Sequence, residues 1–458
     1  MPRDGRQEGG CVRGELAQSG SEAPVVPATA TQGADTRDHR WSWVEASIWT
    51  ERMLAALDNG VKGGKWFSLI DKVYRPATLQ AAWRRVAANA GAAGVDEQSV
   101  KQFAAQQERY LEELEQALKT GTYQPLPVKR VEIPKAGGKR RPLGIPAVKD
   151  RIVQTGLKLV MEPIFEREFE NTSYGFRPGR SCKEALREVD RLLKEGNTHV
   201  VDADLQSYFD SIPHARLMAA VSERISDGRL LALIEAFLQQ DVLHGLQRWT
   251  PMAGTPQGAV ISPLLANIYL HDLDRHMRQK GYRMVRYADD FVVLTASASQ
   301  ARAALVEVQA WVQTNALTLN EEKTHVGDCL QVGQGFDFLG YRFEAGRRGV
   351  RRKSLMALRD RIRARTARSR GVSLQRLIGE LNPLLRGWFN YFKHAHPPIF
   401  QTIDGFTRRR LRALLSRQTK QPGFGRGLRF SRQWPNTFFA EHGLFTLAAA
   451  HAVASQSR

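Results

Sequence analysis

The chain has 458 residues, of which 42% are hydrophobic, and it carries a formal net charge of +20. This length suits about three domains of ~150 residues, and the hydrophobic share is enough to fill their cores, as in a multidomain enzyme. No apolar run reaches membrane-spanning length and no apolar segment marks the amino terminus for secretion, so neither a membrane partner nor export is expected.

The cysteines and the distribution of charge further limit the classes of protein to which the chain can belong. Cys11, Cys182 and Cys329 lie far apart without CxxC spacing, so neither a disulfide framework nor a zinc site is indicated, and a reducing cytoplasm is expected. Residues 341–458 contain 25 Lys and Arg against 5 Asp and Glu, whereas the first 340 residues contain 42 of each. A solvated helix face is the ordinary explanation for a charge run, but an imbalance this large repels itself without a polyanion. The last quarter is therefore predicted to bind nucleic acid.

The amino-terminal half contains a predicted tail and a predicted hairpin. Residues 1–44, rich in Gly, Ala, Ser, Thr and Pro over most of their length, are expected to be disordered. Within Val128–Val148, the Gly137-Gly138 pair lies between Ile133-Pro134 and Arg141-Pro142, which predicts a β-hairpin with basic side chains at its tip. Such a hairpin can close over a triphosphate; the alternative is that its basic side chains touch only template phosphates.

Two acidic sites lie among β-forming residues: Asp204 in VVDADLQSYFD, and the Asp289-Asp290 doublet in VRYADDFVVL. The stretch 283–295 is predicted to form strand, tight turn and strand, with both carboxylates of the doublet at the tip. Carboxylates at strand ends need a positive partner, and hard divalent cations with oxygen ligands provide one. Two Mg²⁺ ions held by these carboxylates would activate a 3′-hydroxyl and stabilise departing pyrophosphate, as in a template-directed polymerase. Alone, the doublet is weak support, because Asp pairs are common at hairpin turns.

The basic quarter is predicted to be helical. An arginine-rich helix ends at Gly371, whose left-handed tolerance suits a helix stop. A second helix begins after Ser373 as N-cap, and a third covers about residues 399–417. Trp388 is interpreted as core packing rather than as a base-stacking residue.

Further segments of the chain, taken in order, resemble the reverse transcriptases encoded by bacterial group II introns, from about residue 45 to the carboxyl terminus. The motifs that carry the resemblance are GVDEQSV, VEIPKAGGKRRPLGIPAVKDRIVQ, YGFRPGRSCKEAL, DADLQSYFDSIPH, GTPQGAVISPLLANIYLHDLD, YADD, LTLNEEKTHV, FDFLGYRF and LNPLLRGWFNYF. Their joint order over roughly three hundred residues makes the resemblance specific.

This resemblance implies a right-hand polymerase fold of the α/β class followed by an all-α thumb or maturase domain. The expected parts are α/β fingers with amino-terminal helices over residues 45–190, a palm with an antiparallel sheet over 191–344, the thumb over 345–419 and a DNA-binding-like segment over 420–458. The implied activity is an RNA-directed DNA polymerase that copies intron RNA into cDNA and assists splicing as a maturase. The expected partners are group II intron RNA, a DNA primer or target and dNTPs, with a homodimer kept open, in the bacterial cytoplasm near the nucleoid.

The resemblance also implies roles for individual residues. Two Mg²⁺ ions are expected on Asp204, Asp289 and the Leu205 carbonyl, with Asp290 in support and Lys323 protonating pyrophosphate. The nucleotide is expected to contact Lys135, Arg141, Leu205, Phe209 and Gln257, with Phe209 excluding a 2′-hydroxyl. Template and primer contacts are expected at Gly258, Tyr287, Leu339 and Gly340. Gly258 lies in the GTPQG turn, which is expected to be followed by a helix over 261–273. Tyr287 opens the YADD segment, and Leu339 and Gly340 lie in an expected FLGY hairpin. RNA is expected to contact Arg361, Arg365 and Arg368.

No cysteine follows Cys329, so the paired cysteines of an HNH endonuclease are missing, and the chain resembles the short, group IIC type of these proteins. Two other functions stay open from sequence. One is a host-adapted reverse transcriptase of defence or repair, against which the intact stretch Leu381–Phe392 argues. The other is an RNA-binding splicing cofactor with a vestigial polymerase site.

Overall fold

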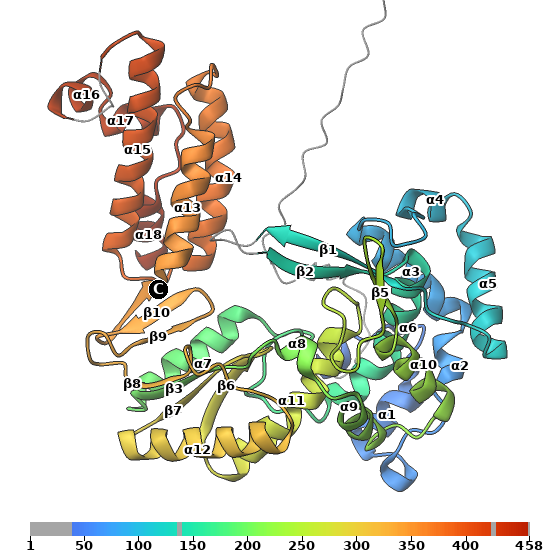
Figure 1. Ribbon diagram of the computed structural model, residues 1–458. Coiled ribbons are helices and arrows are strands. Elements are labelled where there is room, and N and C mark those ends of the chain that lie inside the picture. The colour runs from blue at the N-terminus through green and yellow to red at the C-terminus, as the bar shows by residue number, and fades with distance from the viewer. Residues whose placement is uncertain (1–38, 135–139, 423–426, 457–458) are drawn as a thin grey trace, which may run out of the picture. The chain divides into compact units, whose positions relative to one another are not determined.

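The computed structural model describes residues 39–134, 140–422 and 427–456 (Figure 1). The chain divides into Met1–Ser42 and Trp43–Arg458. Most of the predicted tail, residues 1–44, lies outside the described residues. Its last residues are ordered instead, with the 3₁₀ helix η1 at His39–Trp41 and a buried Val44, because apolar side chains at this point are removed from water.

The amino-terminal part of the larger unit is helical. Its elements are α1 (Glu51–Asn59), η2 (Lys62–Gly64), α2 (Ile70–Val73), α3 (Pro76–Asn89), α4 (Val100–Ala104), α5 (Gln107–Thr120) and α6 (Val148–Glu166). Trp83 packs on Phe103, and Phe103 packs on Tyr110, which holds α3, α4 and α5 together. Helix α6 is buried along most of its length and accepts the indole N–H of Trp49 on the Leu159 carbonyl, 3.0 Å away.

The predicted hairpin is confirmed. Strand β1 (Val128–Pro134) pairs antiparallel with β2 (Arg140–Ile145), and its tip, residues 135–139, lies outside the described residues. β1 also pairs in parallel with β4 (Val242–His244), which forms a short hairpin with β5 (Gln247–Trp249), so that the sheet has the order β2-β1-β4-β5. The short helices α8 (Tyr208–Ser211), α9 (His214–Ser222) and α10 (Gly228–Leu238) precede this second hairpin.

The central sheet has the order β6-β7-β3-β8 and is antiparallel throughout. Its strands are β3 (His199–Asp204), β6 (Arg283–Tyr287), β7 (Asp290–Thr295) and β8 (His325–Asp328). Helices α7 (Cys182–Lys194) and α12 (Ala298–Thr314) cover its opposite faces, and α11 (Ser262–Gln279) lies against β6 (Figure 1). The alternation of apolar residues explains this, because Val200, Val292 and Leu294 face the α7 side while their sequence neighbours face the other. The expected antiparallel palm sheet is confirmed.

The chain from residue 336 onward, which includes the basic quarter, forms a small sheet and a helical bundle. Strands β9 (Phe336–Phe338), β10 (Tyr341–Glu344) and β11 (Arg347–Val350) form an antiparallel sheet. The bundle consists of α13 (Arg352–Arg365), α14 (Leu374–Phe392) and α15 (Pro398–Gln418), followed by α16 (Leu428–Gln433), α17 (Asn436–Glu441) and α18 (Leu447–Gln456). Residues of α16 to α18, including Phe439 and Leu447, share one hydrophobic core with α14 and α15.

Of the helix boundaries predicted in the bundle, the start of α14 and both ends of α15 are confirmed to within one residue, and the end of α13 was wrong. Ser373 caps α14, accepting a hydrogen bond from the Arg376 amide at 3.3 Å, as predicted. Helix α13 ends at Arg365 rather than at Gly371, because Arg410 of α15 donates to the carbonyl and hydroxyl of Thr366 and so satisfies the helix end early. Trp388 packs on Phe392 and Phe400, in agreement with a core role. Among the described helices, none combines the length and apolarity needed to cross a membrane.

One buried carboxylate caps two helices at once. Asp227 accepts backbone hydrogen bonds from Leu69 and Ile70 at the start of α2, at 2.7 and 2.8 Å, and from Arg229 and Leu230 at the start of α10. Burial alone would raise the pKa of Asp227, but these four donors outweigh it and hold the pKa below its ordinary value of 3.8. The carboxylate therefore stabilises the fold above that ordinary value, and the stabilisation is lost as pH falls through the folded pKa.

Replacement of this carboxylate tests its double capping role. Asp227→Ala is expected to lower the free energy of unfolding at pH 7 by about 3 kcal/mol, since four backbone donors, two of them in buried hydrogen bonds, lose their acceptor. Ser297→Ala is the control: the Ser297 hydroxyl caps α12 by accepting one backbone hydrogen bond, from the Gln300 amide, and its loss is expected to lower the free energy of unfolding by about 1 kcal/mol. Urea unfolding measures both, and equal losses would show that the second helix gains nothing from Asp227.

Candidate active site and nucleic-acid surface

The YADD segment forms the tight turn between β6 and β7. Tyr287 pairs with Asp290, which leaves Ala288 and Asp289 as the two loop residues, and Ala288 has a φ of 60°. A two-residue hairpin loop requires a positive φ at its first central position, where glycine is the easiest residue to accommodate. Tyr287 is half-buried, and its burial together with the neighbouring Cys182 thiol raises its pKa. The turn thus presents Asp289 and Asp290 from a strained backbone.

Strand register brings Asp204 beside this turn. Asp204, the last residue of β3, is the direct partner of Asp290, the first residue of β7, so both side chains leave the same face of the sheet. Leu205 follows in an isolated antiparallel bridge with Leu319, whose two hydrogen bonds use the Asp204 carbonyl and the Gln206 amide. Neither of those two bonds uses the Leu205 carbonyl.

A loop after α12 brings a cation onto Asp204. Residues 318–324 pair with the end of β3, and the Nζ atom of Lys323 lies 2.6 Å from Oδ2 of Asp204. The Thr324 hydroxyl accepts a hydrogen bond from the Asp204 amide at 3.4 Å. Both Lys323 and Asp204 are substantially exposed, so this ion pair adds little stability and leaves the ammonium close to the reacting groups.

The carboxylates of the site repel one another. Burial raises the pKa of Asp289, and the Asp204 carboxylate raises it further, while Arg286 and Lys323 oppose the shift. Asp290 as a whole residue is exposed, but its carboxyl group is surrounded by protein. Desolvation of this group and repulsion from Asp202 and Asp289 raise its pKa to about 7. Crowded carboxylates of this kind are neutralised well by a bound divalent cation.

The oxygen atoms at this site suit a cation whose remaining coordination positions are filled by substrate and water. Within the described ranges, no group of three or more His, Cys, Asp or Glu side chains is arranged to hold a metal ion. Asp204, Asp289 and the Leu205 carbonyl supply only oxygen ligands from two carboxylates and one backbone group. Mg²⁺ is typically bound by one or two carboxylates, with phosphates and water filling its octahedron, so the residues present match that pattern.

Phe209 and Gln257 lie on two adjoining backbone segments. The Thr255 amide donates to the Phe209 carbonyl at 2.6 Å, and the Gln257 side chain donates to Asp210 at 2.9 Å. Burial raises the pKa of Asp210, while the Gln257 hydrogen bond opposes this. Gly258 has a φ of 105°, and a Cβ there would lie 2.3 Å from the Gly144 carbonyl in β2. The GTPQG turn thus joins the fingers hairpin to the segment after Asp204.

Of the two expected triphosphate contacts, one can be placed. Arg141 is exposed on β2, opposite Ile133, and Lys135 lies outside the described residues. The expected FLGY hairpin is confirmed, with Leu339 and Gly340 at positive φ between β9 and β10. The Tyr391 hydroxyl of α14 donates to the Leu339 carbonyl at 2.8 Å and so fixes this turn from the helical bundle.

Arginine side chains gather between α13 and α15. The guanidinium groups of Arg359, Arg363 and Arg409 each lie within 6 Å of the Phe406 ring. Burial lowers the pKa of the nearby Arg410, and repulsion from Arg363, Arg409 and Arg368 lowers it further. The expected RNA contacts are on the same segment, with Arg361 exposed and Arg365 and Arg368 half-buried.

Sequence reasoning missed several residues that shape this site. Arg286 is buried beneath the YADD turn, Asp210 holds Gln257, and Tyr391 holds Leu339. Only Arg286 leaves a signal in the sequence, because a charged residue flanked by Val285 and Tyr287 in an apolar strand requires a buried partner.

Comparison with known proteins agrees with this geometry. Residues 133–343 match the model described as reverse transcriptase (RNA-dependent DNA polymerase), and residues 355–434 match the group II intron maturase-specific domain. The chain is 37% identical over 316 residues to Protein YkfC of Escherichia coli (strain K12), an alignment that covers 60% of this chain and 82% of that protein. It is 38% identical over 208 residues to the group II intron-encoded protein LtrA of Lactococcus lactis subsp. cremoris, covering 45% of this chain and 34% of LtrA.

A further relative is the uncharacterized 91 kDa protein in cob intron of Schizosaccharomyces pombe, 29% identical over 371 residues, which cover 62% of this chain and 46% of that protein. The chain thus spans less than half of LtrA and of the yeast protein. It belongs to the reverse transcriptases, a family of RNA-directed DNA polymerases. Within them it is a group II intron-type reverse transcriptase with a maturase domain.

Phe209 generates a test of sugar discrimination. If its half-buried ring lies beneath the sugar of the incoming nucleotide, Phe209→Ala is expected to raise the use of ribonucleotides relative to deoxynucleotides by about tenfold, since the cavity admits a 2′-hydroxyl. Tyr208→Phe is the control, because the Tyr208 hydroxyl donates to the Ala266 carbonyl in the core. Single-nucleotide incorporation with each nucleotide measures the ratio, and an unchanged ratio in Phe209→Ala would place the discrimination elsewhere.

Proposed function

We propose that this protein copies group II intron RNA into cDNA and assists the splicing of that RNA. The observation that carries the polymerase half is the convergence of Asp204, Asp289 and Asp290 at paired strand ends, in a chain of the reverse transcriptase family. The maturase half is supported by the match over residues 355–434 and by the surplus of positive charge in that region.

The residues of the proposed site divide the work by chemistry. Asp204, Asp289 and the Leu205 carbonyl would hold two Mg²⁺ ions, which when bound would supply Lewis-acid activation of the 3′-hydroxyl and charge stabilisation at the phosphates. Asp290 supports this pair, and its raised pKa fits a group that shares the local negative charge. Lys323, 2.6 Å from Asp204, delivers a proton to departing pyrophosphate.

The proposed substrate contacts are those that the resemblance implies. Lys135 and Arg141 are proposed to contact the triphosphate, and Phe209 and Gln257 the sugar and base of the nucleotide. Gly258 and Tyr287 lie along the template and primer, as do Leu339 and Gly340, whose positive φ values form a turn that lets backbone approach a strand closely. We further propose the division into fingers 45–190, palm 191–344, thumb 345–419 and a DNA-binding segment 420–458.

Two alternatives are less well supported. A vestigial polymerase site does not account for the intact carboxylate group, with Lys323 paired to Asp204 and Gln257 held by Asp210. A host-adapted role in defence or repair does not account for the maturase-specific match. Intron RNA is therefore the proposed template and splicing substrate.

Loss of one carboxylate tests the catalytic assignment. Asp289→Ala is expected to lower cDNA synthesis at least about a thousandfold, because several kcal/mol of charge stabilisation are lost, while RNA binding stays within about twofold of wild type. Primer extension and filter binding measure the two quantities. Glu321→Ala, an exposed acid in the Lys323 loop, is the control. Substantial extension by purified Asp289→Ala would contradict the assignment.

Salt dependence tests the nucleic-acid surface. Arg361, Arg365 and Arg368 are replaced together by Gln. The slope of log RNA affinity against log salt concentration is expected to become shallower by about two units, because fewer phosphates are neutralised and fewer counterions are released on binding. Splicing assistance is expected to fall in parallel, while single-nucleotide incorporation at saturating template–primer survives.

The control for that experiment removes the same charge elsewhere. Arg109, Arg191 and Arg275 each pair with a carboxylate of their own helix, so Gln at these positions is expected to leave the slope near wild type. If both triple variants gave the same slope, the basic quarter would be an ordinary solvated surface.

A further inference from the structure

Arg286 is a fully buried cation directly beneath the YADD turn. It lies in the edge strand β6, with an exposed side-chain fraction of 0%. Its neighbours in the strand, Val285 and Tyr287, are apolar or aromatic, so nothing in the strand itself neutralises the charge. A buried guanidinium persists only when its charge and its N–H groups are satisfied, and replacement of a whole buried ion pair by well-packed apolar residues is often neutral or stabilising. Its presence here therefore calls for an explanation beyond stability.

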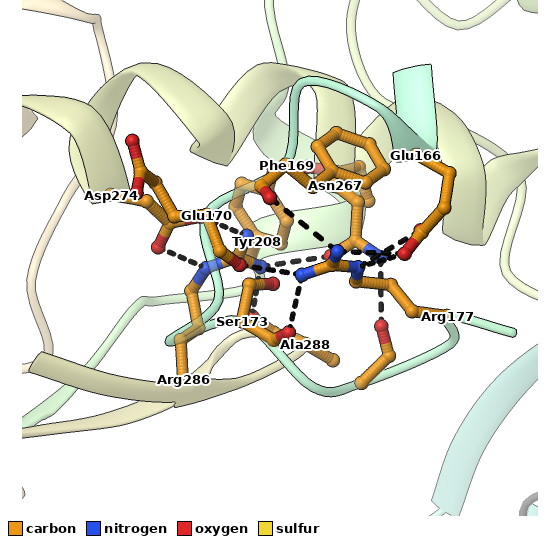
Figure 2. A network of polar contacts seen from close by, with 12 residues as sticks. Glu166, Phe169, Glu170, Ser173, Arg177, Tyr208, Asn267, Asp274, Arg286 and Ala288 are labelled. Carbon is orange, nitrogen blue, oxygen red and sulfur yellow. Dashed lines mark hydrogen bonds and ion pairs between the residues drawn. The ribbon is translucent and has the colours of Figure 1, made fainter. Parts of the chain in front are cut away.

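The partners of Arg286 connect helix α11 to the turn. Its Nε atom donates to Asp274 at 2.7 Å, and an Nη atom pairs with the other oxygen of the same carboxylate. Its other Nη atom donates to Asn267 at 2.8 Å and to the Ala288 carbonyl at 2.9 Å. Figure 2 shows the guanidinium between Asp274 and the Ala288 carbonyl. Two residues of α11 thus anchor the guanidinium group of Arg286, and that group in turn holds the backbone of the turn.

A second backbone contact presses on the same turn. The side-chain amide of Asn267 donates to the Gly175 carbonyl at 2.8 Å, and the backbone amide of Tyr174 donates to the Arg286 carbonyl at 2.9 Å. A Cβ at Gly175 would lie 2.2 Å from the Ala288 nitrogen, so that segment touches the turn directly. The loop residue Ala288 is held between these two contacts at a φ of 60°, a conformation that a non-glycine residue keeps only where its surroundings impose it.

We propose that Arg286 is a positioning residue for catalysis, which, anchored by Asp274 and Asn267, holds the Ala288 carbonyl and so fixes the strained turn that presents Asp289 beside Asp204. This inference rests on the proposed polymerase function. The carboxylates can bind cations and align a 3′-hydroxyl only if the turn stays within a fraction of an ångström of one geometry. A lysine at position 286 keeps the charge but lacks the planar fork that reaches Asp274, Asn267 and Ala288 together.

The neighbouring Arg177 provides a matched control. It is also buried, with 2% of its side chain exposed, and it pairs with a carboxylate, that of Glu166 (Figure 2). It donates to the carbonyls of Glu170 and Ser173, both at 2.6 Å, and these bonds hold the loop before Gly175 rather than the turn. Arg177→Lys therefore measures what loss of a buried, paired arginine does when no direct hydrogen bond to the turn is removed.

The test compares Arg286→Lys with Arg177→Lys in single-nucleotide incorporation, thermal unfolding and Mn²⁺ binding followed by electron paramagnetic resonance. Both variants are expected to lower the melting temperature by similar amounts. Arg286→Lys is expected to lower kcat about tenfold with KM for dNTP within about twofold, and to weaken Mn²⁺ binding about threefold or more, because the turn is displaced. Arg177→Lys is expected to change kcat and Mn²⁺ binding by less than about twofold.

A double-mutant cycle separates positioning from packing. Glycine adopts a positive φ without strain, so in the Ala288→Gly background the further substitution Arg286→Lys is expected to lower kcat only about threefold or less. Additive losses, or equal kcat losses in Arg286→Lys and Arg177→Lys, would make Arg286 an ordinary core residue and overturn the inference. If Arg286→Lys does not fold, Asp274→Asn enters the same comparison, because it loosens the same anchor. Failure of the wild-type chain to extend a primer would instead contradict the proposed function.

Discussion

Repulsion among carboxylates is the constraint on which the centre of this protein depends. Strand register sets Asp204 opposite Asp290, and the tight turn adds Asp289, so three negative groups share one end of a sheet. Burial and mutual repulsion raise the pKa values of Asp289 and Asp290. Such a group persists because cations surround it: Lys323 contacts Asp204, and the charge of Arg286 lies beneath Asp289. Divalent cations that arrive with a nucleotide would neutralise the same carboxylates.

The last quarter of the chain, residues 341–458, has the opposite problem, an excess of positive charge. Arginine side chains of α13 and α15 crowd around Phe406 and lower the pKa of Arg410, so this region gains from a polyanion in the way that the palm gains from cations. A hydrogen bond from Tyr391 to the Leu339 carbonyl links the helical bundle to the β9–β10 turn. One chain therefore combines an acidic site for nucleotide chemistry with a basic surface for the nucleic acid.

Local patterns predicted much of this architecture. Alternating apolar residues and the Ala-Asp-Asp tip predicted strand, turn and strand over residues 283–295, and Ser373 predicted the start of α14, because these features depend on neighbours in sequence. The end of α13 was not predictable, since Thr366 is capped by Arg410 from another helix. The pairing of β4 with β1 was missed as well, because contacts between distant segments leave no local period.

The site residues divide in the same way. Asp204 and the Asp289-Asp290 doublet are visible as acids among strand formers, whereas the partners of Arg286 come from α11 and from the Gly175 segment, which only the fold brings together. Asp210 is likewise recognisable only through its hydrogen bond to Gln257. Tertiary contacts thus decide which of the many charged residues position the turn.

We propose that the carboxylates of this turn form a cation-dependent polymerase site. The most direct measurement is extension of a DNA primer on an RNA template by the purified wild-type chain, with dNTPs and a titration of Mg²⁺. Template-directed cDNA synthesis is expected to rise with Mg²⁺ and to disappear with a chelator. Absence of extension at every Mg²⁺ concentration, in a preparation that still binds the RNA template, would contradict the assignment of these carboxylates to a polymerase site.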